Sequence, residues 1–410
     1  MLDERIPGTG ADLLAGRESP QSPKGVGMRH AVIAGAGFAG LTVAVALLQR
    51  GWSVTVCERA SSVRSEGYNI AFHENGLRSL EVLGLVDRAL EGAQRMPSRQ
   101  TRDRHGRVTA DFDANYRVYR VSRPHLAGVL AEEAQRLGAE FRFRAEVAGA
   151  RPEGVLLLGD GSALRGHLVV AADGVNSKVR DALGLLASRT IPGEGATRFI
   201  MPREPGELGE DDDGMTGFEF WSGRRRFLYR PATATTAYCT LTCPERDLPG
   251  RQIPIDAATW MHSFPTVAHV IEKAAREADW AEARWAQYQI IRLKRWSRGS
   301  VAVVGDAAHA MVPNLGQGAN CAIMNALALA LTVADAADVE AALLEWERRE
   351  RPIIEHAQRW SSLFTAPLAW PEWLWSVVVP RAGRMAWMQR QMTRAARYEP
   401  KGYAALRKAG

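Results

Sequence analysis

A glycine-rich turn between an apolar strand and an apolar helix constrains the fold of this chain more than any other feature. An apolar run at residues 30–34 is followed by the turn Gly35-Ala36-Gly37-Phe38-Ala39-Gly40, and residues 41–50 have the composition of a helix. A second apolar run at 53–57 ends in Glu58. This strand–helix–strand unit predicts a parallel sheet at the start of an α/β fold.

The spacing of the glycines indicates a dinucleotide. Gly35 permits the tight turn, Gly37 lets the backbone approach a pyrophosphate, and Gly40 lets the helix pack closely on the strand. The helix N-terminus adds N–H donors and a positive partial charge, and Glu58 is placed to accept hydrogen bonds from ribose hydroxyls. The turn alone does not distinguish NAD from FAD, and a tight turn that binds no nucleotide is the structural alternative.

Two later acidic turns favour a long dinucleotide. Asp173-Gly174 ends the apolar run 168–172, and Gly305-Asp306 ends the run 300–304. In a doubly wound sheet the loops after such strands contact the ligand. The segment 315–320 precedes an apolar helix expected at 319–334, so its N–H groups would face the same ligand. From spacing alone, a helix cap at Asp306 and a merely permissive turn at 315–320 remain alternatives.

The glycine turn at 35–40 and the two acidic turns, at 173–174 and 305–306, follow one another in this order. Together they resemble the motifs of the single-component (class A) FAD-dependent aromatic monooxygenases with the para-hydroxybenzoate hydroxylase fold. The resemblance spans residues 28–355 and implies tightly bound, non-covalent FAD. It implies that Glu58 binds the adenosine ribose, Arg123 the pyrophosphate region and Asp306 the ribityl chain, and His309 is interpreted as structural. The residues that it assigns to the cofactor are Gly35, Gly37, Phe38, Ala39, Gly40, Glu58, Arg59, Arg123, Asp173, Gly174, Gly305, Asp306, Pro313, Gly316, Gly318, Ala319 and Asn320.

The predicted architecture is a Rossmann-like FAD-binding domain with an inserted substrate domain. The FAD-binding domain is expected at 28–72, 100–185 and 286–355, and the substrate domain, with its mainly antiparallel sheet, at 73–99 and 186–285. Alternating apolar residues at 216–221, 226–230 and 236–242 indicate that sheet, and one helix is expected over 257–275. Residues 356–410 are expected to be helical. Residues 1–27 are expected to be a disordered leader, with Met28 as the candidate functional start.

Substrate contacts are predicted from the resemblance to pyridine-ring-opening members of the same family. It implies that Arg198, Arg226 and Tyr238 contact the substrate, with Pro313 beside the flavin ring. Two guanidinium groups suit an aromatic carboxylate or phenolate. This chain has Arg99 where those members have a substrate-contacting tyrosine, which puts the identity of the recognised ring in doubt. From spacing alone, each of the three is a solvated strand residue.

The implied activity is an oxygenation that uses NAD(P)H and O₂. NAD(P)H, bound transiently, reduces the flavin, O₂ adds at flavin C4a, and one oxygen atom passes to an anionic aromatic or N-heteroaromatic ring like a hydroxypyridine or hydroxybenzoate. Hydroxylation or ring opening, and NADH or NADPH, are left open. The alternatives are a flavin sensor or scaffold without turnover, and a flavin halogenase, whose Trp-x-Trp-x-Ile-Pro signature Trp373-Leu374-Trp375 does not complete.

Composition argues against other classes of partner. The chain has 52 Lys and Arg against 46 Asp and Glu, but the cations are dispersed and no stacking module accompanies them, so no nucleic acid is expected. No apolar run reaches the roughly 18–20 residues of a membrane-spanning helix. Four cysteines and the lack of a recognisable secretory signal favour the reducing cytoplasm. A monomer or homodimer is expected.

Overall fold

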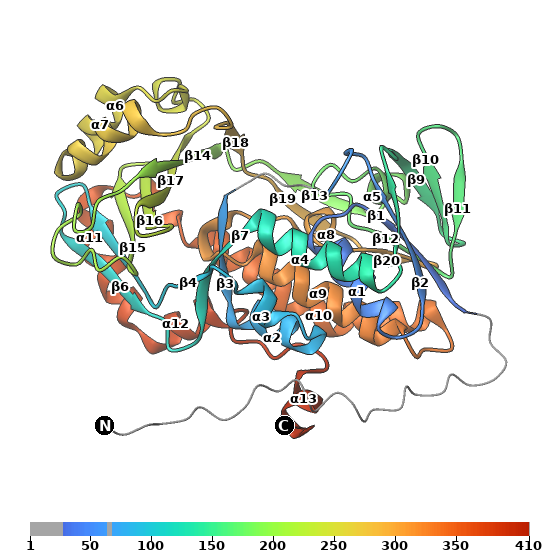
Figure 1. The fold of residues 1–410 in the computed structure, drawn as a ribbon. Helices are drawn as coiled ribbons and strands as arrows, with labels where there is room; N and C mark the ends of the chain where they lie inside the picture. The colour runs from blue at the N-terminus through green and yellow to red at the C-terminus, as the bar shows by residue number, and fades with distance from the viewer. Residues whose placement is uncertain (1–27, 64–67, 410) are drawn as a thin grey trace, which may run out of the picture.

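The computed structural model describes residues 28–63 and 68–409. Its larger layer contains a six-stranded sheet, and the glycine turn follows one of the central strands of this sheet (Figure 1). The predicted leader lies outside the described residues. The strands lie in the spatial order β20 (Ser297–Arg298), β21 (Val301–Val303), β12 (Leu168–Ala171), β1 (His30–Ala34), β2 (Ser53–Glu58) and β8 (Glu140–Phe143). All pairs except β20 with β21 are parallel, as the strand–helix–strand pattern predicts.

Apolar helices bury this sheet. Helix α1 (Phe38–Leu48) packs against α9 (Gly318–Val333) and α4 (Arg123–Arg136), and α9 packs against α10 (Val339–Leu363). Residues 39–47 of α1 are buried on every side of the helix, which explains why its sequence shows no polar face. Strand β1, α1 and α9 therefore form the centre of the main core, with the glycine turn held rigidly at its edge.

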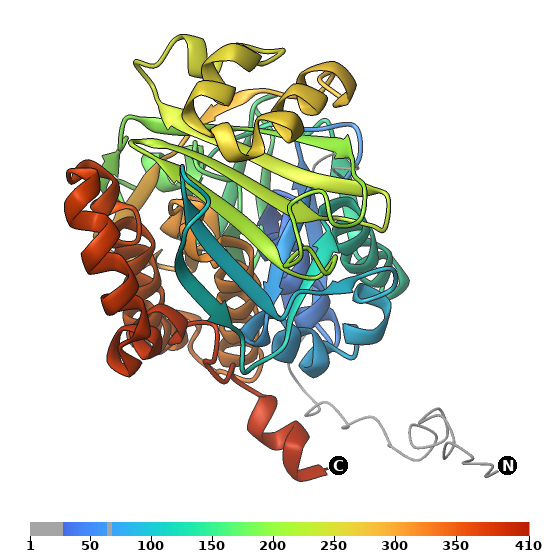
Figure 2. The ribbon, with the colours of Figure 1, turned by 90° about the vertical axis from the view of Figure 1, so that its left-hand side faces the viewer.

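A seven-stranded sheet forms the second layer. Its strands lie in the order β18 (Trp285–Gln287), β14 (Glu194–Pro202), β17 (Thr236–Pro244), β16 (Arg225–Pro231), β15 (Gly217–Ser222), β5 (Ser98–Asp103) and β6 (Val108–Asp113). One face is apolar and packs against α6 (Ala257–Ser263) and α7 (Ala268–Glu277), which cover it on the side away from the first sheet (Figure 2). The opposite face, called here the polar face, carries the substrate residues predicted from the sequence.

Two segments lie in a different layer from the one that the sequence pattern predicts. Residues 100–113 are expected in the FAD-binding domain, but β5 pairs in parallel with β15 and β6 pairs with β5, so both strands belong to the second sheet. Residues 74–83, expected in the substrate domain, form α2 (Glu74–Leu83) and bury Leu77, Leu80 and Leu83 in the main core against α9. Local patterning identifies a strand or helix but not its distant partner.

Two segments contain more local structure than the sequence pattern predicts. The helix expected over 257–275 is interrupted at Pro265, where the 3₁₀ turn η3 (Pro265–Val267) separates α6 from α7, because proline cannot donate the in-helix hydrogen bond. The loop expected after β21 contains the short helix α8 (Asp306–His309) and the 3₁₀ turn η4 (Pro313–Leu315).

Smaller sheets, helices and turns complete the fold. One three-stranded sheet has the order β3 (Asn69–His73), β7 (Val118–Ser122), β4 (Gln94–Arg95), another β11 (Ala163–Arg165), β10 (Val155–Leu158), β9 (Val147–Arg151), and β13 (Leu186–Thr190) pairs with β19 (Ile290–Leu293). The remaining helices and turns are α3 (Val86–Ala89), α5 (Lys178–Ala182), η2 (Pro249–Arg251), η5 (Ala366–Ala369), α11 (Glu372–Arg384), α12 (Ala386–Thr393) and α13 (Tyr403–Ala409). The helical C-terminal segment is thus observed through 409.

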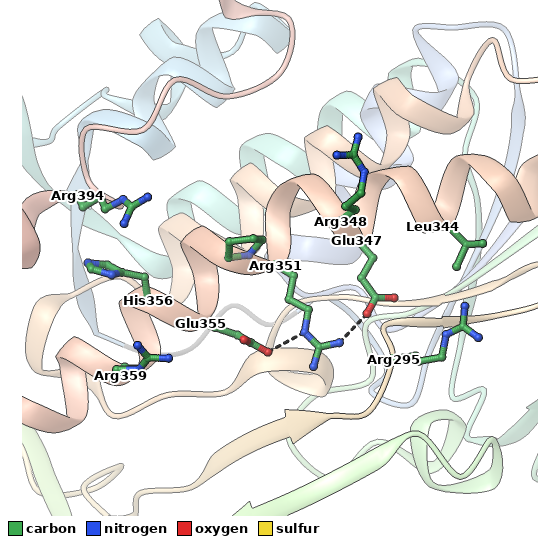
Figure 3. A pocket seen from close by; sticks show the side chains of 10 residues that line it. Arg295, Leu344, Glu347, Arg348, Arg351, Glu355, His356, Arg359 and Arg394 are labelled. Carbon is green, nitrogen blue, oxygen red and sulfur yellow. Dashed lines mark hydrogen bonds and ion pairs between the residues drawn. The ribbon is translucent and has the colours of Figure 1, made fainter.

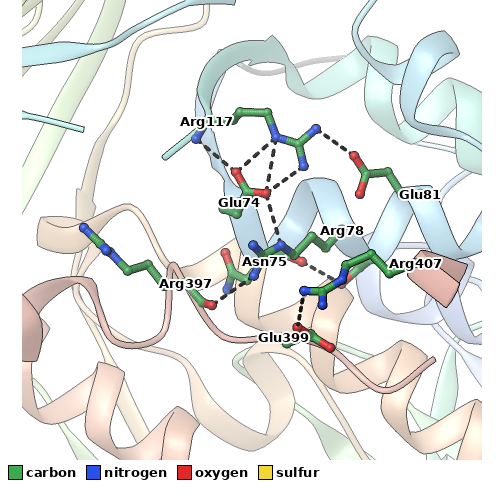
Figure 4. A network of polar contacts seen from close by, with 9 residues as sticks. Glu74, Asn75, Arg78, Glu81, Arg117, Arg397, Glu399 and Arg407 are labelled. Atoms are coloured by element: carbon green, nitrogen blue, oxygen red, sulfur yellow. Dashed lines mark hydrogen bonds and ion pairs between the residues drawn. The ribbon is translucent and has the colours of Figure 1, made fainter. Parts of the chain in front are cut away.

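A polar network fastens this C-terminal segment to α2 (Figure 4). The backbone N–H of Asn75 donates to Ala396 O at 2.9 Å, and Arg78 donates to Arg397 O at 3.1 Å. Glu74 accepts hydrogen bonds from the guanidinium of Arg117 and forms an ion pair with Arg78, whose Nε lies 3.1 Å from Glu74 Oε1. Across residues 28–63 and 68–409, no helix combines the length and the apolar character required to cross a membrane.

Candidate active site

The loops predicted to contact a dinucleotide meet at one edge of the first sheet. Ala34, the last residue of β1, pairs with Cys57 of β2 and with Ala171 of β12, and Ala171 pairs in turn with Val303 of β21. The strands are parallel, so their carboxyl ends coincide. The glycine turn, Glu58 and the two acidic turns therefore follow four adjacent strand ends.

The glycine positions test whether a cofactor fits this edge. Gly35 has φ +100°, and a Cβ there would overlap the carbonyl oxygen of Ala172; a Cβ at Gly40 would overlap the carbonyl oxygen of Gly35. A Cβ at Gly37, in contrast, would meet no atom of the described residues within 4 Å. Gly35 and Gly40 are thus required by the fold, whereas Gly37 borders open space, as expected where a pyrophosphate lies against the backbone.

Glu58 is held in position at the end of β2. Its Oε2 accepts from the N–H of Ala36 at 2.8 Å and its Oε1 from the N–H of Ala60 at 3.0 Å. Each carboxylate oxygen keeps acceptor capacity that ribose hydroxyls could use. The neighbouring Arg59 is exposed just beyond the strand end.

Asp306 lies at the start of α8 with its side chain exposed, although Ala307 and Ala308, which follow it, are buried. Burial raises the pKa of Asp306, and the charge of Arg123 opposes that rise. A carboxyl group that is both accessible and strongly desolvated is expected of a cavity wall. The guanidinium of Arg123 also lies 5.2 Å from the ring centroid of Phe38, so three predicted cofactor residues converge here.

The other acidic turn has a structural task. Asp173 Oδ2 accepts from the N–H of Val179 at 3.3 Å and so anchors the start of α5, and Gly174 has φ +82°. Arg180, whose side chain is fully buried, donates to Ala307 O at 3.1 Å and thereby ties this turn to α8. Sequence reasoning missed this role of Arg180, which lies seven residues after Asp173 in the helix that follows the acidic turn.

Asn320 fastens the loop before α9 to β3. Its Oδ1 accepts from the N–H of His73 at 2.9 Å, and its Nδ2 donates to Ala71 O at 3.0 Å and to Gly316 O at 2.8 Å. The side chain is therefore occupied by the protein, which leaves the backbone as the part of Asn320 that a cofactor could contact.

The N-terminus of α9 presents free N–H groups. The first hydrogen bond within the helix is donated by the N–H of Cys321 to Gln317 O. The N–H groups of Gly318 and Ala319 come before it and therefore have no acceptor within the helix. In the preceding loop Gly316 has φ +64°, and a Cβ there would lie 3.0 Å from His73 Nε2. Pro313 is exposed at the start of η4. These groups are suited to the polar edge of a flavin.

The strand register places the three predicted substrate residues on the polar face. Arg198 of β14 lies opposite Thr240 of β17, and Arg226 of β16 lies opposite Thr242. Tyr238 precedes Thr240 by two residues, so its side chain points to the same side.

Arg198 and Tyr238 belong to one aromatic cluster. Tyr238 stacks on Tyr68 with ring centroids 5.5 Å apart, and the guanidinium of Arg198 lies 6.0 Å from the ring centroid of Tyr288. Burial opposes the charge of Arg198, yet the neighbouring tyrosines, Tyr238 first, raise its pKa. Tyr288 also packs with Val312, the residue before Pro313, which brings this cluster to the flavin loop.

Arg226 lies apart from that cluster, in an internal ion pair. Its Nη1 is 3.2 Å from Glu219 Oε1, and the two side chains are only 3% and 2% exposed. Trp221 Nε1 donates to the same Glu219 oxygen at 2.8 Å. The structure thus gives Arg226 a carboxylate partner within the protein. Sequence reasoning missed Glu219. An acidic residue within the otherwise apolar run of β15 could have indicated a buried partner for an arginine.

Two further arginines extend the polar face. Arg99 pairs with Gly217 in register, and the Cγ of Arg230 lies 3.6 Å from the Cβ position of Gly217. The Arg99 guanidinium is 5.0 Å from the ring centroid of Phe364. Arg230 was missed, although it lies four residues after Arg226 in a strand, a spacing that gives both the same face.

A separate pocket of about 590 Å³ lies on the outer side of α10 (Figure 3). Arginines line it, and Arg351 is paired there with Glu347 at 2.6 Å and with Glu355 at 2.7 Å. None of the residues predicted from the sequence belongs to this pocket. Within the described ranges, no group of three or more His, Cys, Asp or Glu residues could hold a metal ion.

Comparison with known proteins agrees with this geometry. Residues 29–361 match the family model described as an FAD binding domain. The chain is 38% identical over 334 residues to the 2-heptyl-3-hydroxy-4(1H)-quinolone synthase of Mycobacteroides abscessus, covering 80% of this chain and 88% of that protein. It is 31% identical over 313 residues to the 3-amino-4-hydroxybenzoate 2-monooxygenase of Streptomyces cremeus, covering 72% and 76%.

A solved structure extends the comparison to the fold. The tetrameric form of 2-methyl-3-hydroxypyridine-5-carboxylic acid oxygenase superposes with a TM-score of 0.80 at 36% identity, over 91% of this chain and 97% of that chain. The resemblance and the fold class predicted from the sequence motifs are thereby confirmed.

Proposed function

The chain belongs to the FAD-binding-domain family of FAD-dependent aromatic monooxygenases, and on this premise we propose that it uses NAD(P)H and O₂ to insert one oxygen atom into an anionic aromatic or N-heteroaromatic small molecule. One observation carries the choice of an anion. Arg99, Arg198, Arg226 and Arg230 share the polar face, and Glu219, the carboxylate paired there, is already bound to Arg226. Such an excess of cations favours a carboxylate or phenolate.

The cofactor residues would hold FAD without a covalent link. Bound FAD supplies electron transfer from the reductant and the activation of O₂. Glu58 would bind the adenosine ribose, Arg123 the pyrophosphate region and Asp306 the ribityl chain. The free N–H groups of Gly318 and Ala319 would stabilise negative charge at the flavin edge. Transient binding of NAD(P)H is proposed because members of the family use it as a co-substrate.

The substrate would lie between the polar face and the flavin loop. The Arg198 guanidinium and the Tyr238 hydroxyl can orient a ring and favour its ionised form, which is the more nucleophilic one. Packing of Tyr288 on Val312 brings this pair to Pro313, where the ring would face the cofactor. Tyr68, stacked on Tyr238, supplies an apolar wall that keeps water out.

The names of the relatives narrow the substrates to test. They refer to a hydroxypyridine carboxylic acid, an aminohydroxybenzoate and a hydroxyquinolone, all oxygen-substituted aromatic rings. We propose hydroxypyridine or hydroxybenzoate carboxylates for this chain, with either hydroxylation or ring opening as the outcome. The proposed assembly is a monomer or homodimer, although one relative forms a tetramer, and size-exclusion chromatography with light scattering decides between these.

Stimulated oxidation of the reductant tests the proposal. The FAD-loaded protein is mixed with NADH or NADPH, O₂ and each candidate ring, and product mass is measured with isotopically labelled O₂. The expected result is faster NAD(P)H oxidation and a product that carries one labelled oxygen atom, intact or ring-opened. Bound flavin without stimulated oxidation on any ring, or oxidation that yields only peroxide, would support a sensor or scaffold instead.

A further inference from the structure

A buried arginine outside the predicted site has no hydrogen-bond partner among the described residues. Arg120, in β7, is 4% exposed, and its Nε, Nη1 and Nη2 atoms find no acceptor in the part of the chain that the structure describes. Burial of an unpaired guanidinium is costly, so this position is expected to have a partner that the protein itself does not supply.

The small sheet aims Arg120 toward the flavin loop. Ile70 of β3 and Val121 of β7 pack against the main core, so the alternate side chains point the other way. Arg120 lies directly opposite Ala71 and shares that second side with it. The Cβ of Ala71 lies 3.4 Å from the Cβ position of Gly316, in the loop before α9. Because Arg120 points to the same side of the sheet as Ala71, its side chain also faces this loop.

Arg230 approaches the same region from the second sheet. Its Cγ and the Sδ of Met96, which follows β4, both lie 3.6 Å from the Cβ position of Gly217, so β4 and β16 adjoin there. Burial, together with the charges of Arg230 and Arg203, lowers the pKa of Arg120 to about 9. Arg120 and Arg230 therefore lie near enough for their charges to repel each other.

No carboxylate among the described residues acts on Arg120, and the one that acts on Arg230, Glu219, is shared with Arg226. Arg203 is already paired with Asp212 at 2.8 Å. Gln94, opposite Arg120 in β4, has a buried Oε1 without a partner, but a neutral amide cannot offset a charge. Among the described residues, the positive charge of the two guanidinium groups is thus not fully balanced, and an external anion would balance it.

We propose that Arg120 and Arg230 form an anion subsite between β7 and β16 that takes the carboxylate of an aromatic carboxylic acid. This inference rests on the proposed function. It assigns different roles in substrate binding to the arginines of the two sheets. Arg198 with Tyr238 orients the ring, whereas Arg120 with Arg230 holds the carboxylate through charge-assisted hydrogen bonds.

Paired probes test the subsite in the FAD-loaded protein. Binding of 2-methyl-3-hydroxypyridine-5-carboxylic acid and of 3-amino-4-hydroxybenzoate, each beside its uncharged carboxamide, is measured by calorimetry and by perturbation of the flavin spectrum. In Arg120→Met the Kd of an acid should rise by about 10- to 100-fold, the loss expected for a charge-assisted donor, while the carboxamides are unaffected. Arg120→Lys should restore part of the affinity.

A matched control and a stability measurement separate a binding role from a structural one. Arg95→Met removes a nearby exposed cation in β4 and should leave every Kd unchanged. Arg120→Met should raise the melting temperature of the ligand-free holoprotein by a few degrees, because the unpaired charge disappears. A lower melting temperature would instead show that Arg120 supports the fold and would overturn the subsite.

Other outcomes also decide. The subsite is overturned if neither acid binds the wild-type protein, or if acid and carboxamide lose affinity equally in Arg120→Met. Oxygenation of the two acids at the same rate and with the same KM in the wild-type protein and in Arg120→Met would refute the subsite and leave the monooxygenase intact. Arg120-dependent binding of the acids without oxygenated product would support the subsite and refute the proposed activity.

Discussion

The guanidinium of Arg226 lies 3.2 Å from the carboxylate of Glu219, and both side chains are almost completely buried on the polar face of the second sheet. Burial alone would raise the pKa of Glu219, but the charges of Arg226 and Arg99 hold it below its ordinary value. The two residues are therefore expected to act as one unit.

Replacement of Arg226 should consequently affect both stability and kinetics. Arg226→Met leaves Glu219 charged and unpaired in the interior, which should cost about 3–5 kcal/mol of unfolding free energy. It should also raise the KM for the substrate more than it lowers NADH oxidation without substrate. The double variant Arg226→Met/Glu219→Gln should regain most of the stability in urea unfolding. Equal kinetics in the wild-type protein and in the double variant would exclude Arg226 from substrate binding.

Gly37 should be required for the cofactor but not for the fold. Gly37→Ala places a Cβ where no atom of the described residues lies within 4 Å and where φ is −81°, so the apoprotein should melt as the wild type does. FAD retention should fall several-fold, because the methyl group occupies the approach to the pyrophosphate. Gly128→Ala, also in open space but within α4, should leave flavin content unchanged. Full flavin occupancy in Gly37→Ala would contradict the assigned position of the pyrophosphate.

Asp306 should contribute to retention of FAD. Asp306→Ala removes the exposed carboxyl group at the start of α8 that Arg123 faces, and with it the hydrogen bonds expected from the ribityl chain. The flavin-to-protein absorbance ratio after gel filtration should decrease relative to wild type. Asp335→Ala, at an exposed surface ion pair, provides the control. If the two variants retain the same amount of flavin, Asp306 is not a ligand of the cofactor.

Glu350 should make stability depend on pH. This carboxyl group of α10 is fully buried, and burial raises its pKa from 4.5 to about 7 despite opposing charges from Arg349 and Lys401. The folded state therefore binds the proton more tightly, and its stability falls as pH rises from about 4.5 to 7. Glu350→Gln should gain up to about 3 kcal/mol at pH 8 and little at pH 4.5. Urea unfolding at both pH values measures this, and a gain independent of pH would refute the titration of Glu350.

The cofactor edge could be predicted from the sequence because its determinants are local. A tight turn such as that at Gly35 needs a glycine wherever φ is positive, and parallel strands bring their carboxyl ends together whatever lies between them. Glu58 and Asp306 were therefore identified by their positions at strand ends. The helix N-terminus at Gly318 was predictable for the same reason.

The substrate side could be predicted only in part, because its determinants are distant in the chain. Alternation gives Arg198 and Tyr238 a common face once their strands pair, but nothing local reveals that Glu219 neutralises Arg226. Arg120 is a single arginine in an ordinary strand, and only the pairing of β3 with β7 shows which way it points. The break between α6 and α7 at Pro265, in contrast, could have been predicted from the residue type alone.

The inclusion of β5 and β6 in the second sheet also governs how the chain can be divided. No contiguous stretch from 186 to 285 contains the complete layer, since one edge is contributed by residues 98–113. A fragment begun at 186 would expose the unpaired backbone of β15, and such an edge invites self-association. The layer can therefore be completed only after both segments have been synthesised, and excised halves are expected to aggregate unless they are co-expressed.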